Sequence, residues 1–350
     1  MKRILSILIL TALSISSAMA IEVDWPFGDG MVLAKDQPIR IHGKGEGTIT
    51  VRMAGKKAKV SAKDGKWTAT LPAMKAGGPY VMEISEGETS ISFKDVHVGT
   101  VLIVSGQSNM QFKLSESDTP EECYVDDPLL RFFSTPRIEK GEPFTPADGW
   151  VACTAGNAGR WSAIGYLIGR EIREKSGEAV GIINCYQGAS IIEAWIPKET
   201  VARPEFQLPE ESLHFDHRYE VYQAWNQPGL LYDLDIVPIA PYGISHVVWY
   251  QGESNTGNGE AAIYPQLAVE MVKAWRKVLN VKRLPFVMIQ IANYRPRNDD
   301  AWKNLQEAQM KIPSLIKGVK VVPCADVCQD DNIHPRTKTG ISHRVVEAIF

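Results

Sequence analysis

From residue 99 onward, short apolar runs alternate with longer stretches in which apolar residues recur at helical spacing. The apolar runs are VLIVS (101–105), VGIINC (180–185), SHVVWY (245–250), PFVMIQIA (285–292) and GVKVVPCADV (318–327). The helical stretches between them include AIGYLIGREIREKS (163–176), IYPQLAVEMVKAWRKVLN (263–280) and WKNLQEAQMKI (302–312). Strands that are apolar on both faces and separated by helices predict a parallel sheet covered on both sides. We therefore expect an α/β domain over residues 99–350.

The residues before this domain follow a different pattern, with polar and apolar residues alternating at period two. The alternating segments are ITVRMA (49–54), KAKVSA (57–62), KWTATL (66–71), VMEIS (81–85) and SISFKDV (90–96). Turn residues at Asp64-Gly65 and at 77–79 separate them. Short strands at this spacing predict a small β-sandwich over residues 21–98.

The first twenty residues form a third segment. A short basic start precedes an apolar stretch over residues 4–15, shorter than the roughly 20 residues that span a bilayer. Residues 18–20 read Ala-Met-Ala, the small-residue pattern of a cleavage site. We expect a signal peptide over 1–20, cleaved after Ala20, and a periplasmic or secreted protein. Because no cysteine follows the cleavage site to take a lipid, no membrane anchor is expected in the mature protein.

The net charge and the cysteine content of the chain restrict which macromolecules, surfaces or metal ions it is expected to bind. The net charge is −3, which gives no indication of a nucleic-acid partner or a basic membrane-binding surface. The five cysteines are an odd number, so at least one thiol is unpaired, and the pairing of the others is left open. Cys324 and Cys328 lack a His/Cys partner pair at zinc spacing, so no metal site is predicted.

Polar clusters follow four of the apolar runs. They occupy residues 105–109, 184–190, 249–255 and 330–335, and each contains small, amide or acid–base side chains. Ligands bind at the carboxyl ends of the strands in open parallel sheets. Four such clusters at one edge of one sheet therefore predict a functional site there.

These clusters contain the groups that serine acyl transfer requires. A serine hydroxyl needs a base to take its proton, and a carboxylate that orients the imidazole completes the set. Of the seven histidines, His334 alone follows a strand end with an acid, Asp331, three residues before it. His214 and His217 lie in a charged loop and are expected to be solvated. Between the two serines after the first run, Ser105 fits the turn and Ser108 the nucleophile.

Three motifs then resemble one known family. GQSNM (106–110), QGESN (251–255) and Asp331-x-x-His334-Pro335 are similar to motifs of the sialate O-acetylesterase family of SGNH (GDSL-like) hydrolases. DGMVL (29–33) and AGGPY (76–80) resemble the N-terminal domain of that family. The resemblance implies an SGNH-type, flavodoxin-like hydrolase domain after a small β-sandwich. It also implies a carbohydrate O-acetylesterase that needs no metal or organic cofactor.

The resemblance also implies roles for individual residues. Ser108 matches the nucleophile, His334 the general base and later the general acid, and Asp331 the carboxylate that orients it. The oxyanion hole would consist of the Ser108 N–H, the Gly188 N–H and one side-chain amide. That amide belongs to Asn255, with Gln251 as the rival.

The remaining site residues have less specific roles. Gln107 and Asn109 are expected to hold the turn around the nucleophile. Glu253 either orients Gly188 or Asn255, or is the buried partner of an arginine such as Arg160. Where the family often has Trp-Gly-Gly, this chain has Tyr186-Gln187-Gly188, which reshapes the pocket. Three aromatic residues are open to either a sugar-stacking or a core role: Trp161, Trp195 and Tyr186.

Two other functions stay open on the sequence alone. The chain could be a carbohydrate-binding protein whose esterase fold is inactive. A lipase or peptidase is disfavoured, because the G-x-S-x-G pattern of lipases is missing around the serine. Within the esterase reading, O-acetylated sialic acid and an acetylated polysaccharide such as xylan are both candidate substrates, and the sequence does not constrain the oligomeric state.

Overall fold

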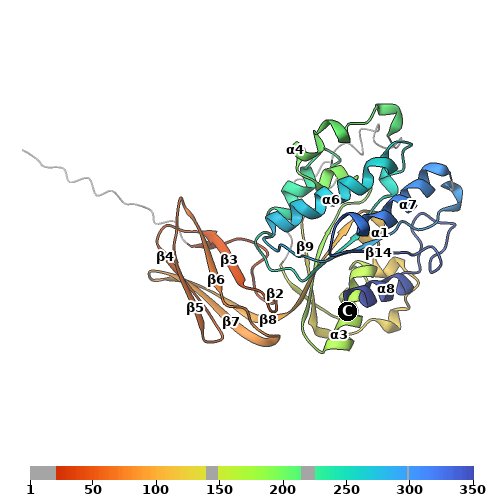
Figure 1. Cartoon of the computed structure of the whole chain (residues 1–350). Coiled ribbons are helices and arrows are strands. Elements are labelled where there is room, and N and C mark those ends of the chain that lie inside the picture. The colour runs from red at the N-terminus through yellow and green to blue at the C-terminus, as the bar shows by residue number, and fades with distance from the viewer. Residues whose placement is uncertain (1–20, 139–148, 214–224, 298) are drawn as a thin grey trace, which may run out of the picture.

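The computed structural model describes residues 21–138, 149–213, 225–297 and 299–350. Its central sheet has the strand order β10-β9-β11-β8-β12-β13-β14 (Figure 1). These strands are β10 (Val151–Cys153), β9 (Asp127–Ser134), β11 (Val180–Tyr186), β8 (Thr89–Gly106), β12 (His246–Tyr250), β13 (Phe286–Ile289) and β14 (Val319–Val322). All neighbouring pairs are parallel except β10 with β9. The predicted α/β class with a largely parallel sheet is confirmed.

Helices cover both faces of this sheet. Helices α3 (Ala163–Ser176) and α8 (Thr339–Ile349) lie on one face, and α6 (Glu260–Val278) and α7 (Asp300–Leu315) lie on the other (Figure 1). Alternate residues of β8 enter different hydrophobic clusters. Val101 and Ile103 belong to one cluster, and Leu102 and Val104 to the other. Burial on both faces explains why the strand is apolar throughout.

Shorter helices complete the described part of the chain. They are α1 (Ser108–Gln111), α2 (Ala155–Ala158), α4 (Lys198–Val201), η1 (Leu114–Glu116), η2 (Glu121–Cys123), η3 (Ile192–Trp195), η4 (Pro204–Phe206), η5 (Glu210–Ser212), η7 (Tyr232–Ile236), η8 (Glu253–Asn255) and η9 (Arg295–Arg297). No helix in the described ranges is both long and apolar enough to cross a membrane.

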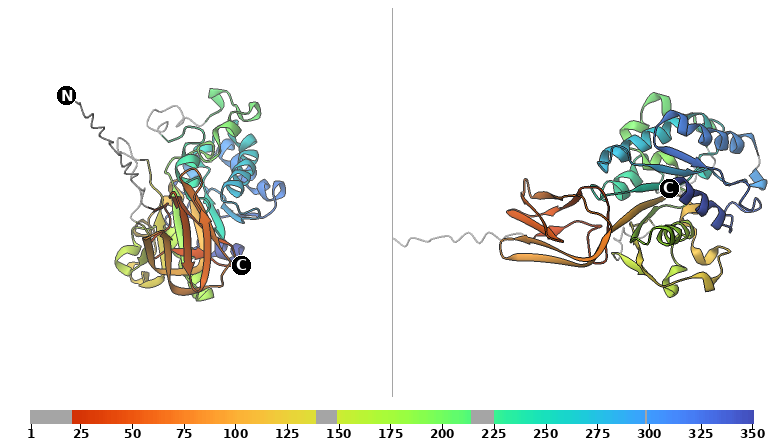
Figure 2. Two further views of the ribbon diagram at one scale, coloured as in Figure 1. Left: turned by 90° about the vertical axis from the view of Figure 1, so that its left-hand side faces the viewer. Right: turned by 60° about the horizontal axis from the view of Figure 1, so that its bottom comes forward.

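The N-terminal region is built from two sheets (Figure 2). One contains β1 (Glu22–Val23), β3 (Ile39–Lys44) and β6 (Lys66–Leu71). The other contains β2 (Val32–Ala34), β4 (Thr48–Met53), β5 (Lys56–Ser61), β7 (Gly77–Glu86) and the first part of β8. Inward residues of both sheets, such as Ile41 and Val51, are fully buried. This arrangement agrees with the predicted small β-sandwich.

Strand β8 belongs to both parts of the molecule. Residues 89–98 pair with β7, whereas residues 100–106 lie between β11 and β12. The boundary expected after residue 98 therefore lies inside one continuous strand (Figure 2). Gly99 lies at the crossing point, where a Cβ atom would be 1.9 Å from the Ala179 carbonyl oxygen. The close approach of the two backbones requires glycine at this position.

The local patterns hold in part. The turn expected at Asp64-Gly65 is confirmed, with φ of 52° and 73° at the two residues. The turn expected at residues 77–79 is wrong: these residues lie in β7, at an irregularity in its pairing with β8. Strand β9 was not among the predicted strands. The signal peptide expected at 1–20 lies outside the described residues.

The cysteines form no disulfide in the structure. Cys153, Cys185 and Cys324 are buried free thiols, and Cys123 and Cys328 are partly buried free thiols. Across the described ranges, no three His, Cys, Asp or Glu side chains cluster in a way that could hold a metal ion.

Candidate active site

Ser108 is the first residue of α1, directly after β8. The chain turns sharply at Gly106, whose φ is 135° and whose added Cβ would lie 2.0 Å from the Tyr250 carbonyl oxygen. Only glycine fits this left-handed, crowded position. Because β8 lies between β11 and β12, the turn presents Ser108 where chain connections diverge to either side of the sheet. Ligand sites in open α/β sheets form at this kind of position.

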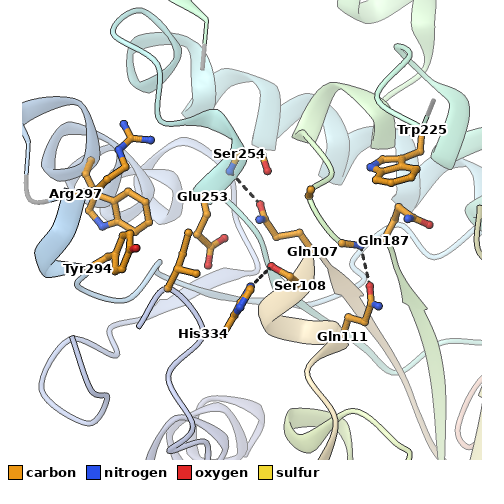
Figure 3. A pocket seen from close by; sticks show the side chains of 14 residues that line it. Gln107, Ser108, Gln111, Gln187, Trp225, Glu253, Ser254, Tyr294, Arg297 and His334 are labelled. Carbon is orange, nitrogen blue, oxygen red and sulfur yellow. Dashed lines mark hydrogen bonds between the residues drawn. The ribbon is translucent and has the colours of Figure 1, made fainter. Parts of the chain in front are cut away.

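The loop after β14 brings His334 to Ser108. The imidazole Nε2 lies 2.7 Å from the Ser108 hydroxyl oxygen, although the residues are 226 positions apart (Figure 3). The His334 backbone N–H donates to the Asn332 side-chain oxygen at 2.9 Å, which fixes the loop locally. Burial of the imidazole, followed by the charge of Lys338, lowers the pKa of His334. The imidazole is therefore neutral near pH 7 and can accept the serine proton.

Asp331 is placed differently from a triad carboxylate. Its side chain is exposed, and no hydrogen bond joins it to His334 in the described part of the chain. The neighbouring Asp330 is paired instead with Arg295, at 2.5 Å. The D-x-x-H spacing thus brings the carboxylate onto the same loop as the base without bringing the two side chains into contact. The orienting role of Asp331 stays a prediction.

Gly188 follows β11 and lies close to Ser108. A Cβ atom on it would lie 4.0 Å from the Ser108 Cβ atom. The Gly188 N–H donates to the side-chain oxygen of Gln111 at 2.9 Å (Figure 3). The predicted oxyanion donor is therefore near Ser108, but a neighbouring amide oxygen accepts its hydrogen bond in the structure.

The two amides proposed to complete the oxyanion hole are directed into the protein. Asn255 is 1% exposed, and its nitrogen donates to the Glu193 carboxylate at 3.0 Å. Gln251 is fully buried, and its nitrogen donates to the oxygens of Gln107, Ser190 and Asn255 at 3.1, 3.0 and 2.8 Å. Both side chains therefore use their donors to hold the loop after β12. In the structure, neither amide is therefore directed toward Ser108, as the predicted side-chain donor of the oxyanion hole would be.

Gln107 lies between this loop and Ser108. Its side-chain oxygen accepts hydrogen bonds from the Gln251 amide, the Gly252 N–H and the Ser254 N–H, at 3.1, 3.3 and 3.3 Å. In the described part of the chain, its amide nitrogen has no hydrogen-bond acceptor, and the side chain lines the pocket beside Ser108 (Figure 3). The expectation that Gln107 supports the turn agrees with the contacts of its oxygen.

Asn109 connects three segments beneath the site. Its nitrogen donates to Glu253 at 2.5 Å and to the Ile333 carbonyl oxygen at 2.9 Å, and its oxygen accepts from Lys338 at 2.7 Å. Lys338 is fully buried, and burial lowers its pKa to about 8. The partner of Glu253 is thus Asn109, while Arg160 lies over the ring of Trp161. Sequence reasoning missed Lys338, because a lysine in a polar loop normally predicts exposure.

Two pockets meet at Ser108. One, of about 590 Å³, is lined by Gln107, Ser108, Gln111, Gln187, Gly188, Ala189, Trp225, Glu253, Ser254, Tyr294, Arg297, Trp302, Ile333 and His334 (Figure 3). The other, of about 620 Å³, is lined by Ser108, Gln111, Phe112, Lys113, Glu116, Gly188, Asn332, His334 and Arg336. The first pocket is the more aromatic, and the second carries more charged side chains.

The aromatic residues of the pocket differ from those expected. Trp161 and Trp195 are in the hydrophobic core, and Tyr186 packs against it, so none of the three lines the pocket. Its aromatic wall comes instead from Trp225, Tyr294 and Trp302. Trp302 lies in the first turn of the predicted helix that begins near it, whereas no local sequence pattern indicated that Trp225 and Tyr294 would lie beside it. His214 and His217 lie outside the described residues.

Gln187, which stands where the family often has glycine, attaches the pocket to the end of the segment after β9. Its side chain accepts from the Ile138 N–H at 3.2 Å and donates to the Ile138 carbonyl oxygen at 3.3 Å. Both ends of this amide are therefore used inside the protein. The replacement changes the pocket wall and leaves the Gly188 N–H close to Ser108.

Comparison with known proteins shows which proteins this chain resembles. The chain is similar to mouse and human sialate O-acetylesterase, each 25% identical over 338 and 345 residues. These matches cover 80% and 85% of this chain, but 62% and 63% of the relatives. The chain thus spans less than two thirds of the length of the curated relatives it matches.

A solved structure and a family model are also similar. The crystal structure of a novel carbohydrate acetylesterase from Xanthomonas citri superposes with a TM-score of 0.81 and 31% identity, covering 94% of this chain and 74% of that one. The family described as "Carbohydrate esterase, sialic acid-specific acetylesterase" matches residues 98–345, which is well over half of the chain. The chain therefore belongs to this family of carbohydrate esterases.

Proposed function

We propose that this protein is a serine esterase that removes O-acetyl groups from carbohydrates. The observation that carries the proposal is the 2.7 Å contact between the Ser108 hydroxyl and the His334 imidazole at the junction of two pockets. Family membership supports the substrate class, because the similar proteins are named as acetylesterases of sialic acid or of carbohydrates. The same contact disfavours a binding protein with an inactive esterase fold.

The reaction follows from the two side chains in two steps. In the first, the Ser108 hydroxyl oxygen bonds to the acetyl carbonyl carbon while His334 takes its proton. The tetrahedral intermediate then loses the sugar oxygen, to which His334 returns the proton, and an acetyl-serine remains. In the second, His334 takes a proton from water, the water oxygen attacks the acetyl-serine, and acetate leaves as Ser108 regains its proton. Asp331 would assist by orienting the imidazole if its carboxylate turns toward the ring.

The pocket walls support a sugar as the leaving group. Trp225 and Tyr294 give the first pocket flat apolar surfaces of the kind on which sugar rings pack. Side-chain amides such as Gln111 offer donors and acceptors to hydroxyl groups. Acetylated sialic acid and acetylated polysaccharide both present this combination.

The proposal is tested by replacing the nucleophile. Ser108→Ala should abolish acetate release from p-nitrophenyl acetate and from an acetylated sugar, because among the residues that the structure describes no other hydroxyl is hydrogen-bonded to the His334 nitrogen. Ser105→Ala is the matched control, because Ser105, the other serine near this turn, is fully buried and lines neither pocket. Full turnover in the Ser108 variant would overturn the assignment. A panel of acetylated glycans assayed with the wild-type protein then identifies the sugar.

We also infer that the protein is exported, with residues 1–20 removed as a signal peptide. The basic start, the apolar stretch and the Ala-Met-Ala ending support this inference. Sequencing of the N-terminus of the protein from a periplasmic or culture fraction should begin at Ile21. A cytoplasmic protein that retains Met1 would contradict it.

A further inference from the structure

The residue after Gly188 has an unusual backbone conformation. Ala189 has a φ of 54°, in the left-handed region that residues other than glycine, Asn and Asp seldom adopt. Gly188, which could adopt this region freely, does not have a positive φ, so the strain lies on the alanine. Ala189 lines the same pocket as Ser108. A strained residue persists only where its surroundings hold it, and such residues gather at functional sites.

Asn226 holds this conformation from a distant part of the chain. Its side-chain nitrogen donates to the Ala189 carbonyl oxygen at 2.9 Å, and its side-chain oxygen accepts from the Ile191 N–H at 3.0 Å. A carbonyl oxygen can only accept and a backbone N–H can only donate, so the two partners determine which end of the amide faces which residue. One side chain is thus hydrogen-bonded to the backbone on both sides of Ser190.

The neighbouring backbone groups are held in the same way. The Ser190 carbonyl oxygen accepts from the Gln251 side chain, and the Ile192 N–H donates to the Asn255 side chain, both at 3.0 Å. Both of these amides belong to the loop after β12. The segment lies outside the strands, so side-chain amides rather than a neighbouring strand position the backbone that follows Gly188.

Gly188 itself lies between two fixed points. Before it, the Gln187 N–H donates to the Gly106 carbonyl oxygen at 3.1 Å. After it, the Ala189 carbonyl oxygen is held by Asn226. Because the backbone is held on both sides, the Gly188 N–H has one preferred direction.

We infer that Asn226 is a positioning residue, which directs the Gly188 N–H toward the substrate carbonyl oxygen by holding the segment after Gly188. The inference rests on the proposed esterase function, with this N–H as a donor to the oxygen on which charge develops. The N–H faces the pockets in the structure, because its acceptor, the Gln111 side chain, lines both of them. A donor that is already in place stabilises developing charge without reorganisation during the reaction.

Asn226→Asp removes one of the two contacts. An aspartate keeps an oxygen for the Ile191 N–H, but it has no donor for the Ala189 carbonyl oxygen and places a negative charge beside it. Ala189 can then leave the left-handed region, and the direction of the Gly188 N–H changes with it. We expect kcat for p-nitrophenyl acetate to fall by about 10–100-fold with KM little changed, since a small misplacement at an active site can cost about 10²-fold.

The next residue in the sequence provides the control. Gln227→Glu makes the same chemical change at an exposed side chain that lines neither pocket, and it should keep the wild-type kcat. Asn226 does not line either pocket, so a lower kcat in its variants cannot come from a lost contact with the substrate.

A second substitution distinguishes positioning from a general loss of stability. Glycine adopts the left-handed region freely, so a glycine at position 189 depends less on the Asn226 contacts. In the Asn226→Ala protein, adding Ala189→Gly should therefore raise kcat by about three- to tenfold. If Asn226 contributed only to the stability of the fold, a glycine in this loop would restore nothing.

A further measurement reads the tetrahedral state without turnover. Methylboronic acid adds to a serine oxygen and places one of its own oxygens where the substrate carbonyl oxygen would gain charge. Asn226→Asp should bind it about 10–100-fold more weakly than the wild-type protein, since the same misplaced N–H is required. Gln227→Glu should bind it as tightly as the wild-type protein.

The outcomes distinguish this inference from the proposed function. If Ser108→Ala abolishes turnover while Asn226→Asp keeps the wild-type kcat and boronic acid affinity, the Asn226 inference is wrong and the esterase stands. If the wild-type protein releases no acetate but its boronic acid affinity depends on Asn226, the esterase proposal fails and the positioning role stands. All assays are run well below the melting temperature of each variant, so that a fall in kcat which Ala189→Gly does not relieve would also overturn the inference.

Discussion

At the scale of single residues, the state of His334 determines when the site can react. The imidazole is partly buried beside the Phe112 ring, and the Lys338 Nζ atom lies 4.8 Å from the centre of that ring. Burial, followed by the Lys338 charge, makes the imidazolium ion unfavourable and lowers the pKa below the ordinary 6.5. Glu116 acts in the opposite direction with a smaller effect.

The pH dependence of kcat/KM follows from this shift. Because the proposed base, His334, must be neutral and its pKa in the folded protein is lowered, activity should persist below pH 6.5 and fall only as the pH drops through the lowered value. Lys338→Met removes a cation from the neighbourhood of the imidazole, so the pKa of His334 should rise. The acidic limb of the kcat/KM profile of this variant should therefore move to higher pH. The measurement is a pH profile of kcat/KM for both proteins. A wild-type limb at or above 6.5 would contradict the account.

Asp331 gives a second prediction at this scale. Its carboxylate is exposed and has no hydrogen bond to His334, so we expect Asp331→Asn to lower kcat less than tenfold. In a catalytic triad, changing the carboxylate that is hydrogen-bonded to the base into an amide lowers kcat by about 10⁴. Steady-state kinetics distinguish the two cases, with His334→Ala as the inactive reference. A loss near the triad value would show that Asp331 turns to the imidazole during the reaction.

At the scale of elements, Asn109 joins the helix that carries the proposed nucleophile to the loop that carries the proposed base. One side chain contacts Glu253 after β12, the Ile333 carbonyl next to His334, and Lys338 before α8. Burial raises the pKa of Glu253 and lowers that of Lys338, because it disfavours the charged form of each group. The distance between Ser108 and His334 thus depends on this amide.

Asn109→Ala should therefore weaken both the fold and the reaction. It leaves Glu253, Lys338 and the Ile333 carbonyl short of buried partners, at a cost on the order of 3 kcal/mol in the free energy of unfolding. It also releases the His334 loop, so kcat should fall in the remaining folded protein. Urea unfolding and kinetics at low temperature measure the two effects. Asn304→Ala, on the exposed side of α7, serves as the control, and equal stabilities would disprove the coupling.

The sequence was informative where a pattern repeats along an element and less so where contacts form across the fold. Helix α3 covers the residues predicted, since its apolar spacing, the Ser162 cap and Gly177 all lie in one segment. Strand β9 was missed because Arg131 interrupts its apolar pattern. The side chain of Arg131 is 4% exposed and is paired with Asp95 and the Gly30 carbonyl, which only the folded chain brings near.

The same limit applies to the site. Ser108, Gly188 and His334 follow strand ends and were predicted from that position. The roles of Gln107, Gln251 and Asn255 depend on which amide faces the pocket, and no spacing in the sequence encodes that. Trp225, Tyr294 and Trp302 likewise meet only in the folded chain.

At the scale of the whole molecule, β8 connects the N-terminal region to the α/β domain through one continuous backbone. Side-chain contacts add to this connection: the Tyr242 hydroxyl donates to the Val32 carbonyl and the Trp150 indole to the Pro26 carbonyl, both at 2.7 Å. The N-terminal region therefore supports the central strand whose end carries Ser108.

A buried carboxyl group beneath the central sheet predicts how stability depends on pH. Burial raises the pKa of Asp235, on η7, from 3.8 to about 8. The folded protein therefore holds a proton that the unfolded chain releases, and this group lowers stability progressively as the pH rises between those values. Asp235→Asn should be more stable than the wild-type protein near pH 8 by about 2–4 kcal/mol, and the gain should shrink near pH 5.

Denaturant unfolding at the two pH values measures this difference. Asp233→Asn is the matched control, because Asp233 lies on the same short helix but is exposed. A gain that does not depend on pH would show that Asp235 is ionised in the folded protein.

The most direct test of the central claim is detection of the covalent intermediate. The protein is mixed with an excess of p-nitrophenyl acetate and quenched with acid during turnover, and its peptides are analysed by mass spectrometry. The account predicts one acetyl group on the peptide that contains Ser108 in the wild-type protein, and no acetyl group on the corresponding peptide of the Ser108→Ala variant. An enzyme that turns over substrate while this peptide stays unmodified, or that carries the acetyl group on another residue, would contradict Ser108 as the nucleophile.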